Sequence, residues 1–213
     1  LTVKKGEKVL ILGASGSGKS SLMSVITGYI HPDRGDIFLA EKDRSGLISM
    51  VEQDAFIFSG TLEENLFCEG AAEEAEMKEL FQKLGLSALY KEGQDVAERG
   101  RNLSGGERKR LSLARGFYRN SEILILDEPL ANVDAENIGR IENLILGIRD
   151  RTVILISHQV SDALYAGVDS VYELRDGKLR CLKSDDSRCD RGGAEVSTIS
   201  ATKIGKISDV GCI

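Results

Sequence analysis

The segment that most constrains this fold is a glycine-rich loop at residues 13–20 with the sequence GASGSGKS. It follows an apolar run at 7–12 and precedes a stretch at 20–29 that has apolar residues at helical spacing. The pattern G-x-x-x-x-G-K-S between a strand and a helix is that of a phosphate-binding loop, or P-loop. Its glycines allow several backbone N–H groups to face one anion, and the helix adds its N-terminal dipole. The segment therefore predicts a strand–loop–helix unit that binds the phosphates of a nucleotide.

Further apolar runs indicate the rest of the sheet. The runs at 122–127 and 152–157 are continuous enough for strands buried on both faces, and helical patterns at 107–118 and 135–148 separate or follow them. The chain therefore has the pattern of an α/β fold with a mostly parallel sheet covered on both sides. Four smaller elements are also expected: strands of a small second sheet at 37–39 and 47–51, an amphipathic helix at 71–84, and a hairpin of 169–174 with 178–182 around Asp176-Gly177.

Composition excludes several classes of protein. The formal net charge of −6 disfavours a general nucleic-acid binder, which usually has a basic face. The apolar runs are far shorter than the ~20 residues that span a bilayer, and no signal peptide is evident, although a chain that begins at Leu1 can be a piece of a longer one. The four cysteines fit neither a zinc spacing nor a dense disulfide framework, so free thiols are expected.

The P-loop supplies the predicted nucleotide-binding residues. Lys19 can reach the β- and γ-phosphates, and the Ser20 hydroxyl can ligate Mg²⁺. The predicted set is Gly13, Ala14, Ser15, Gly16, Ser17, Gly18, Lys19, Ser20 and Ser21.

Polar residues at the ends of three other strands are candidates for the chemistry. Ligands gather at the carboxyl ends of strands in α/β sheets, so Asp127 suits a Mg²⁺ ligand and Glu128 a base that polarises the attacking water. His158 ends the next strand and is expected at the γ-phosphate, although a lone histidine is more often structural. Gln53 follows the run at 47–51, and its amide can accept a water proton and ligate Mg²⁺. The predicted catalytic residues are therefore Glu128, His158 and Gln53, and the predicted metal ligands are Ser20, Gln53 and Asp127.

A second glycine-rich turn has the sequence LSGGE at residues 103–107. It also presents backbone N–H groups at a helix start, where anions bind. The simpler interpretation is a helix cap, in which Ser104 and Glu107 form a capping box. Both can hold, but a cap does not need Gly105 and Gly106, whereas close approach to a phosphate does. Since this turn and the P-loop cannot serve the same nucleotide, the sequence predicts an ATP site built from two chains.

From residue 2 to residue 182 the motifs resemble the nucleotide-binding domain of ABC ATPases. The matching elements, in the family's order, are the Walker A loop GASGSGKSS, the Q-loop residue Gln53, the signature LSGGE, the Walker B strand ILILDE, the D-loop 131–134 and the H-loop residue His158. The resemblance implies a P-loop NTPase core with a small antiparallel β-subdomain and a helical subdomain inserted at about 54–119. The ATP-binding domain would span 1–183, and 184–213 would be a weakly structured tail.

The resemblance also implies the ligands and the first partner. ATP and Mg²⁺ would bind between two such domains, identical or not, arranged head to tail. Ser104, Gly105, Gly106 and Asp134 would act on the nucleotide held by the partner. The aromatic residue on which this family stacks adenine would lie before Leu1, and the short spacing from Lys19 to Gln53 implies a trimmed β-subdomain.

Two segments resemble the exporter branch of the family: FIFSGTLEEN at 56–65 and the X-loop Glu98-Arg99-Gly100. They imply an ATPase domain at the cytoplasmic face of a membrane, attached through its Q-loop and X-loop region to a transmembrane domain that this chain lacks. A nucleotide-gated module with slow turnover is the alternative. A DNA-associated ATPase is disfavoured by the acidic composition and by the short segment between Gln53 and Ser104, so no nucleic-acid partner is expected.

Overall fold

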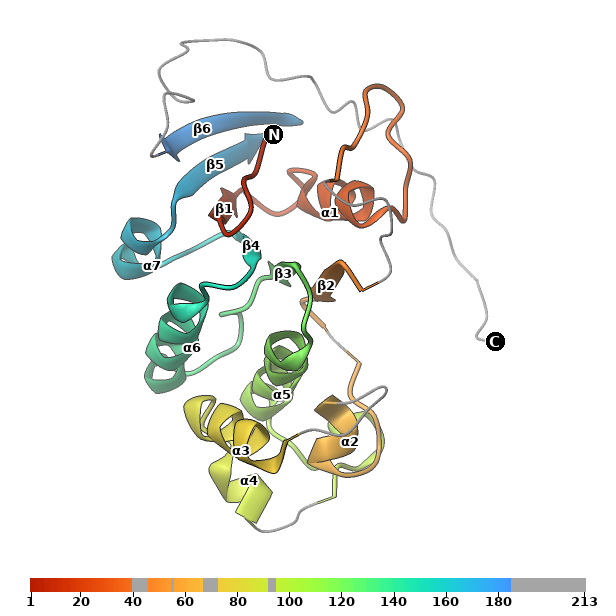
Figure 1. Ribbon diagram of the computed structural model, residues 1–213, viewed down its shortest axis with the longest axis vertical. Helices are drawn as coiled ribbons and strands as arrows, with labels where there is room; N and C mark the ends of the chain where they lie inside the picture. The colour runs from red at the N-terminus through yellow and green to blue at the C-terminus, as the bar shows by residue number, and fades with distance from the viewer. Residues whose placement is uncertain (40–45, 55, 67–72, 92–94, 185–213) are drawn as a thin grey trace.

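A parallel sheet forms the centre of the protein in the computed structural model, which describes residues 1–39, 46–54, 56–66, 73–91 and 95–184 (Figure 1). The strands are β1 (Lys8–Leu12), β2 (Ile48–Val51), β3 (Ile123–Asp127), β4 (Thr152–Ser157), β5 (Ser170–Arg175) and β6 (Lys178–Ser184). Their order in the sheet is β2-β3-β4-β1-β5-β6. All neighbours are parallel except β6, which is antiparallel to β5. The carboxyl ends of β2, β3, β4 and β1 therefore lie along one edge of the sheet.

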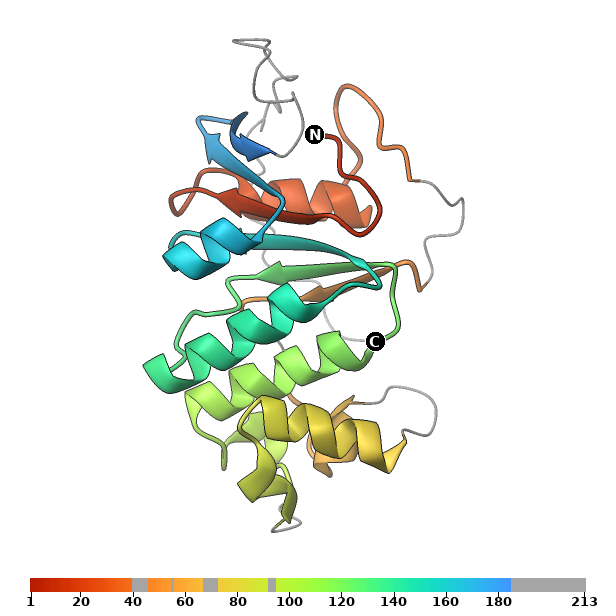
Figure 2. The ribbon, with the colours of Figure 1, turned by 60° about the vertical axis from the view of Figure 1, so that its left-hand side comes forward.

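Helices cover both faces of this sheet. They are α1 (Lys19–Thr27), α2 (Leu62–Leu66), α3 (Glu74–Lys83), α4 (Ser87–Lys91), α5 (Gly105–Tyr118), α6 (Ala135–Gly147) and α7 (Asp162–Gly167), with a 3₁₀ turn at Glu98–Gly100. Figure 2 shows α1 on one side of the sheet and α5, α6 and α7 on the other. The predicted α/β fold with a mostly parallel sheet is confirmed.

The alternation of side chains along the strands explains the two layers. In β3, Leu124 and Leu126 belong to the hydrophobic cluster beneath α5 and α6, whereas Ile125 belongs to the cluster beneath α1. All three are fully buried. Burying such a side chain contributes about 1.5–3 kcal/mol, so strands that are apolar on both faces require helices on both sides.

Helices α2, α3 and α4 lie beyond α5, away from the sheet (Figures 1 and 2). Met77 and Phe81 of α3 are buried and join the larger hydrophobic cluster. The amphipathic helix predicted at 71–84 is therefore present as α3, with residues 71–72 outside the described residues. The domain limits 1–183 and 54–119 stay predictions.

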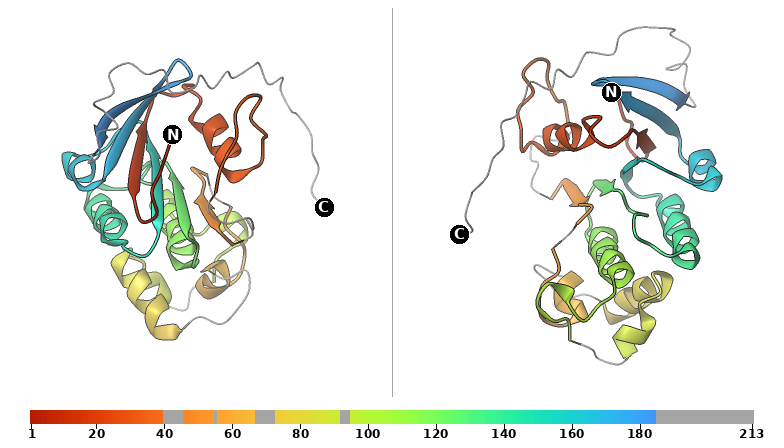
Figure 3. Two further views of the ribbon diagram at one scale, coloured as in Figure 1. Left: turned by 45° about the horizontal axis from the view of Figure 1, so that its top comes forward. Right: turned by 180° about the vertical axis from the view of Figure 1, so that it is seen from behind.

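The small antiparallel part of the sheet is the hairpin of β5 and β6, which extends the main sheet beyond β1 (Figure 3). Its turn residues Asp176 and Gly177 have φ values of 50° and 72°, as a tight hairpin turn requires. The predicted second sheet is wrong: residues 48–51 join the main sheet beside β3, and residues 37–39 form no strand. Phe38, the middle residue of this short apolar run, is 89% exposed.

Two other expectations concern the end of the chain and its cysteines. The tail predicted at 184–213 lies outside the described residues, apart from Ser184, which ends β6. The prediction of free thiols is wrong for Cys181, which is disulfide-bonded. Among the helices of the described residues, none has the length and apolar character needed to cross a membrane.

Candidate nucleotide-binding site

A pocket of about 660 Å³ lies at the carboxyl ends of β2, β3, β4 and β1. Its lining consists of Ala14, Ser15, Gly16, Gly18, Lys19, Ser20, Ser21, Gln53, Asp127, Glu128 and His158. The fold thus brings together the P-loop and the polar strand-end residues that the sequence predicted. A larger groove, about 810 Å³, lies between α3 and α6 and contains none of these residues.

The P-loop has a backbone conformation that depends on its glycines. Gly16 and Gly18 have φ values of 79° and 103°, which side-chain-bearing residues rarely adopt. A Cβ on Gly13 would lie 2.6 Å from Ser17 Oγ and 2.8 Å from the carbonyl oxygen of Leu174, so no larger residue fits there. Lys19 Nζ donates to the carbonyl oxygens of Gly13 and Ala14 at 2.6 and 2.9 Å. The ammonium is therefore held over the loop, where backbone N–H groups and a helix N-terminus favour an anion.

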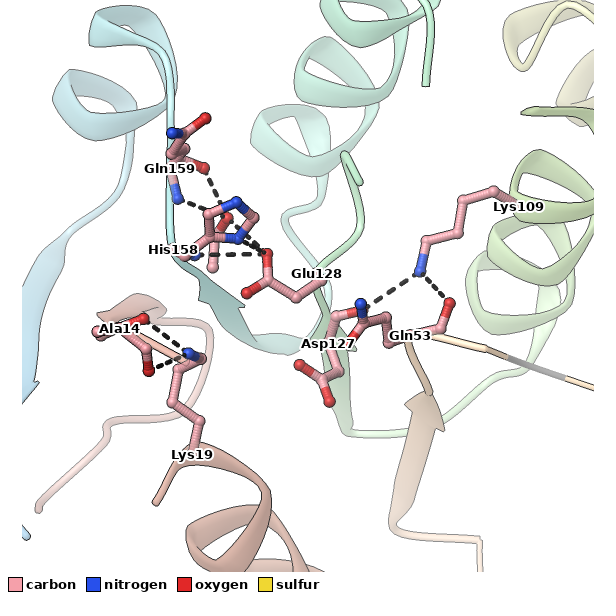
Figure 4. Close-up of polar contacts among 10 residues, drawn as sticks. Ala14, Lys19, Gln53, Lys109, Asp127, Glu128, His158 and Gln159 are labelled. Carbon is pink, nitrogen blue, oxygen red and sulfur yellow. Dashed lines mark hydrogen bonds and ion pairs between the residues drawn. The ribbon is translucent and has the colours of Figure 1, made fainter. Parts of the chain in front are cut away.

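Glu128 is turned toward the end of β4 (Figure 4). Its backbone has a φ of 46°, an uncommon value for a residue other than glycine, and it is 7% exposed. Oε2 lies 2.9 Å from Nδ1 of His158, and it accepts the backbone N–H of His158 at 3.3 Å. Ser157 Oγ lies 3.1 Å from the same oxygen. One carboxylate oxygen is thus fixed by β4, and the carboxyl group still lines the pocket.

Asp127 differs from Glu128 in its surroundings. Burial and the neighbouring Glu128 raise the pKa of Asp127, while the charges of Lys109 and Lys19 oppose the rise. With Ser20 and Gln53 it offers carboxylate, hydroxyl and amide oxygens to the pocket, and a hard cation such as Mg²⁺ prefers oxygen ligands. Among the described residues, no group of three or more His, Cys, Asp or Glu side chains is placed to hold a metal ion. Mg²⁺ needs none, because it keeps waters and binds substrate phosphates alongside one or two carboxylates, so these residues fit it.

Lys109 is a residue of the site that the sequence analysis missed. Lys109 and Arg110 are buried although they belong to a helix rich in basic residues, and each is 7% exposed. Lys109 Nζ donates to the carbonyl oxygens of Gln53 and Asp127 at 3.1 and 3.3 Å (Figure 4). It also donates to the carbonyl oxygen of Glu52 at 3.4 Å. Burial lowers its pKa, while nearby carboxylates raise it. The sequence spacing could have indicated that Lys109 is buried, because it lies four residues before the buried Leu113 and therefore on the same helical face.

The LSGGE segment forms the N-terminus of α5, outside the pocket. Ser104 Oγ accepts the backbone N–H of Glu107 at 3.2 Å, and Glu107 Oε2 accepts the backbone N–H of Ser104 at 2.7 Å. These bonds with Ser104 hold the pKa of Glu107 below its usual value. The capping box is therefore present, with Gly105 and Gly106 as the first two residues of the helix. None of 104–106 is among the described residues that line the pocket.

Arg110 links this segment to residue 134. Asp134 caps α6 by accepting the backbone N–H of Asn137 at 3.1 Å, and Arg110 Nη1 lies 3.3 Å from Asp134 Oδ2. The hydrogen bonds that Asn137 donates are the main reason why the pKa of Asp134 is lowered. A Cβ on Gly106 would lie 3.1 Å from Arg110 Nη1 and 3.9 Å from Asp134 Oδ2. The residues expected to act on a partner's nucleotide thus lie side by side on one surface.

The segment after Gln53 exposes two aromatic rings. Phe56 and Phe58 are 56% and 45% exposed, with their ring centroids 5.0 Å apart. Arg115 lies over the ring of Phe58, and its guanidinium donates to the carbonyl oxygen of Phe56 at 2.9 Å. Gly60 and Val96 form an isolated antiparallel bridge that joins this segment to the turn at 98–100. The exporter-like segments are therefore adjacent in the fold.

Asn65 holds this surface in place, and we expect Asn65→Ala to destabilise the protein by about 1–3 kcal/mol. The side chain is 1% exposed. Its Oδ1 accepts the backbone N–H of Phe58 at 2.9 Å, and its Nδ2 donates to the carbonyl oxygens of Phe58 and Thr61 at 2.9 and 3.0 Å. Alanine leaves the partly buried backbone groups of Phe58 and Thr61 without these hydrogen-bond partners. Urea unfolding followed by circular dichroism measures the loss. The exposed Asn143→Ala on α6 is the control, and equal stability of the two variants would contradict the prediction.

These features define a class of protein: an α/β nucleotide-binding domain with a P-loop. Comparison with known proteins gives the family. Residues 1–131 match the family model described as ABC transporter. The chain therefore belongs to the ABC transporter family, whose ATP-binding domains are ATPases.

Its relatives are longer proteins. The chain is 31% identical over 212 residues to a mesentericin transport/processing ATP-binding protein of Leuconostoc mesenteroides, with 91% of this chain and 28% of the relative covered. It is 37% identical over 177 residues to the glutathione/L-cysteine transport system ATP-binding/permease protein CydC of Haemophilus influenzae, with 76% and 31% covered. Among solved structures, a bacterial Atm1-family ABC exporter with ATP bound matches with a TM-score of 0.74 at 27% identity. That match covers 82% of this chain and 33% of the exporter chain, so this chain spans about a third or less of each.

Proposed function

We propose that this chain is the ATP-binding and ATP-hydrolysing domain of a transporter that exports a substrate across a membrane. One observation carries the proposal. The P-loop, Gln53, Asp127, Glu128 and His158 line one pocket, while the LSGGE segment lies outside it on the same chain. Relatives named for transport and a solved exporter with ATP bound support the same assignment.

The chain's own residues have distinct roles in hydrolysis. Lys19 and the P-loop N–H groups bind the β- and γ-phosphates, which positions the terminal phosphoryl group. Glu128 acts as the base that orients and polarises the attacking water, and its contact with His158 fixes the carboxylate. Gln53 and His158 line the same pocket, where they contact the water or the γ-phosphate. Ser20, Gln53 and Asp127 would hold Mg²⁺, which would supply positive charge next to the phosphates when bound.

A second domain completes each site in this proposal. Ser104, Gly105 and Gly106 present the start of a 14-residue helix, and a helix N-terminus favours an anion. Because they lie outside their own chain's pocket, they act on a nucleotide held by a partner in a head-to-tail dimer. Asp134 is paired with Arg110 of the same helix, so it lies next to these residues and reaches the same interface.

The proposed membrane partner contacts the surface of Phe56, Phe58 and the turn at 98–100. Both rings are exposed, and Asn65 and Arg115 fix the surface to α5. In this proposal the chain lies at the cytoplasmic face of a membrane, and the partner's contact surface lies along α5, from the turn at 98–100 near the helix start to Phe56 and Phe58 beside Arg115.

Two measurements on the full chain test the proposal. Calorimetric titration with ATP and Mg²⁺ is expected to show binding, and phosphate release per chain is expected to rise with protein concentration because two chains form each site. Absence of ATP binding would contradict the assignment. Binding without phosphate release, with a membrane partner present, would favour the nucleotide-gated alternative. Release per chain that is independent of concentration would contradict the shared site.

A further inference from the structure

The buried ammonium of Lys109 joins three parts of the site that are far apart in the sequence. It is bonded to the backbone carbonyls of Glu52 and Gln53 after β2 and of Asp127 at the end of β3. The side chain itself belongs to α5, five residues after Ser104. At 1.5 Å per residue this is about 7.5 Å along the helix. One side chain therefore connects the signature helix with the two strand ends that carry predicted Mg²⁺ ligands.

The chemistry of these contacts is specific to lysine. An ammonium has three donor hydrogens, and three carbonyl oxygens accept here. Burial of a charge is costly unless it is paired and hydrogen-bonded. The charge is compensated by the carboxylates of Asp127, Asp54 and Glu128. An apolar residue at 109 would satisfy the packing around Leu113 but would leave no link between the helix and the strand ends.

We propose that Lys109 is a positioning residue, which holds Gln53 and Asp127 in register with the helix that begins at Ser104. Docking of that helix start on a partner's nucleotide is thereby transmitted to the Mg²⁺ ligands of its own pocket. This inference rests on the proposed function. It assigns to Lys109 an effect on metal binding through other residues, without contact with nucleotide or metal.

The test compares Lys109→Met with Lys109→Arg and with Lys78→Met, a control at an exposed position on α3. Methionine keeps the length of the side chain and removes the charge and donors, whereas arginine keeps both. Calorimetry measures ATP affinity with and without Mg²⁺, and a phosphate-release assay gives the Mg²⁺ concentration for half-maximal turnover.

We expect Lys109→Met to raise that Mg²⁺ concentration about tenfold, as loss of a group that orients metal ligands does. Its ATP affinity without Mg²⁺ should stay within about twofold of the unsubstituted chain, because the P-loop is untouched. Lys109→Arg should require a Mg²⁺ concentration for half-maximal turnover between those of Lys109→Met and the unsubstituted chain. Lys78→Met should behave as the unsubstituted chain.

A folded Lys109→Met with unchanged Mg²⁺ dependence would overturn the inference. So would equal losses of affinity with and without Mg²⁺, which indicate a general structural effect. If circular dichroism shows that Lys109→Met is unfolded, Lys109→Gln, which keeps two donors, is measured against the same criteria. Failure of the unsubstituted chain to bind ATP would instead refute the proposed function, so the two failures are distinguishable.

Discussion

Replacement of Glu128 by glutamine is expected to lower the rate of ATP hydrolysis by about 10²–10⁴-fold, the contribution of a general base. Glutamine has the shape of glutamate, so the position beside β4 and the pocket are preserved. Its amide cannot take a proton from water. ATP binding should therefore remain, and a dimer with bound ATP should accumulate because the step that would release it is blocked. Phosphate release and size-exclusion chromatography with ATP and Mg²⁺ measure the two effects.

Glu122→Gln is the matched control for this prediction. Glu122 immediately precedes β3, at the end of the strand opposite to Glu128, and its carboxylate pairs with Lys5 on the surface at 3.1 Å. The same chemical change there should leave turnover within about twofold, since exposed ion pairs contribute little. Similar hydrolysis by the Glu128→Gln variant and the unsubstituted chain would show that the base lies elsewhere.

The second prediction is recovery of activity when two inactive chains are mixed. Lys19→Ala removes the ammonium over the P-loop. Gly105→Asp puts a negative charge at the start of α5, where a new Cβ has no neighbour closer than 4.0 Å, so the chain itself tolerates it. In a head-to-tail dimer of the two variants, one site has an intact P-loop and an intact partner turn. An equal mixture is therefore expected to recover about a quarter of the normal turnover, because half of the dimers are mixed and each has one complete site.

The control mixture combines Lys19→Ala with Glu128→Gln. Both residues line the same pocket of one chain, so every possible dimer has a defect in both sites. This mixture should stay inactive. Recovery in the control, or none with Gly105→Asp when each variant is folded and dimerises, would be incompatible with a site shared as proposed.

Local sequence patterns predicted the elements that depend on neighbours in the chain. The P-loop and its helix, the capping box of Ser104 and Glu107, and the hairpin turn at Asp176-Gly177 are all present. Each is determined by a few consecutive residues through backbone conformation or a local hydrogen bond. The meeting of the P-loop with Gln53, Asp127, Glu128 and His158 in one pocket followed from the rule that parallel strands present their carboxyl ends at one edge.

The features that were missed depend on contacts between distant segments. The run at 47–51 has the same apolar pattern whether it pairs in a small sheet or beside β3, and only the fold decides between them. Lys109 appears in the sequence as one more basic residue of a charged helix. Its role becomes visible only once the carbonyls of Glu52, Gln53 and Asp127 converge on it.

The place of β2 in the sheet has a mechanical consequence. In the described part of the chain this strand is hydrogen-bonded to β3 on one side alone, whereas β3, β4 and β1 are each held on two. A shift of the end of β2 disrupts a single ladder, so Gln53 follows a strand that has fewer strand neighbours than β3, β4 or β1. A displacement of the surface formed by Phe56 and Phe58 would therefore move Gln53 before it moved β3, β4 or β1.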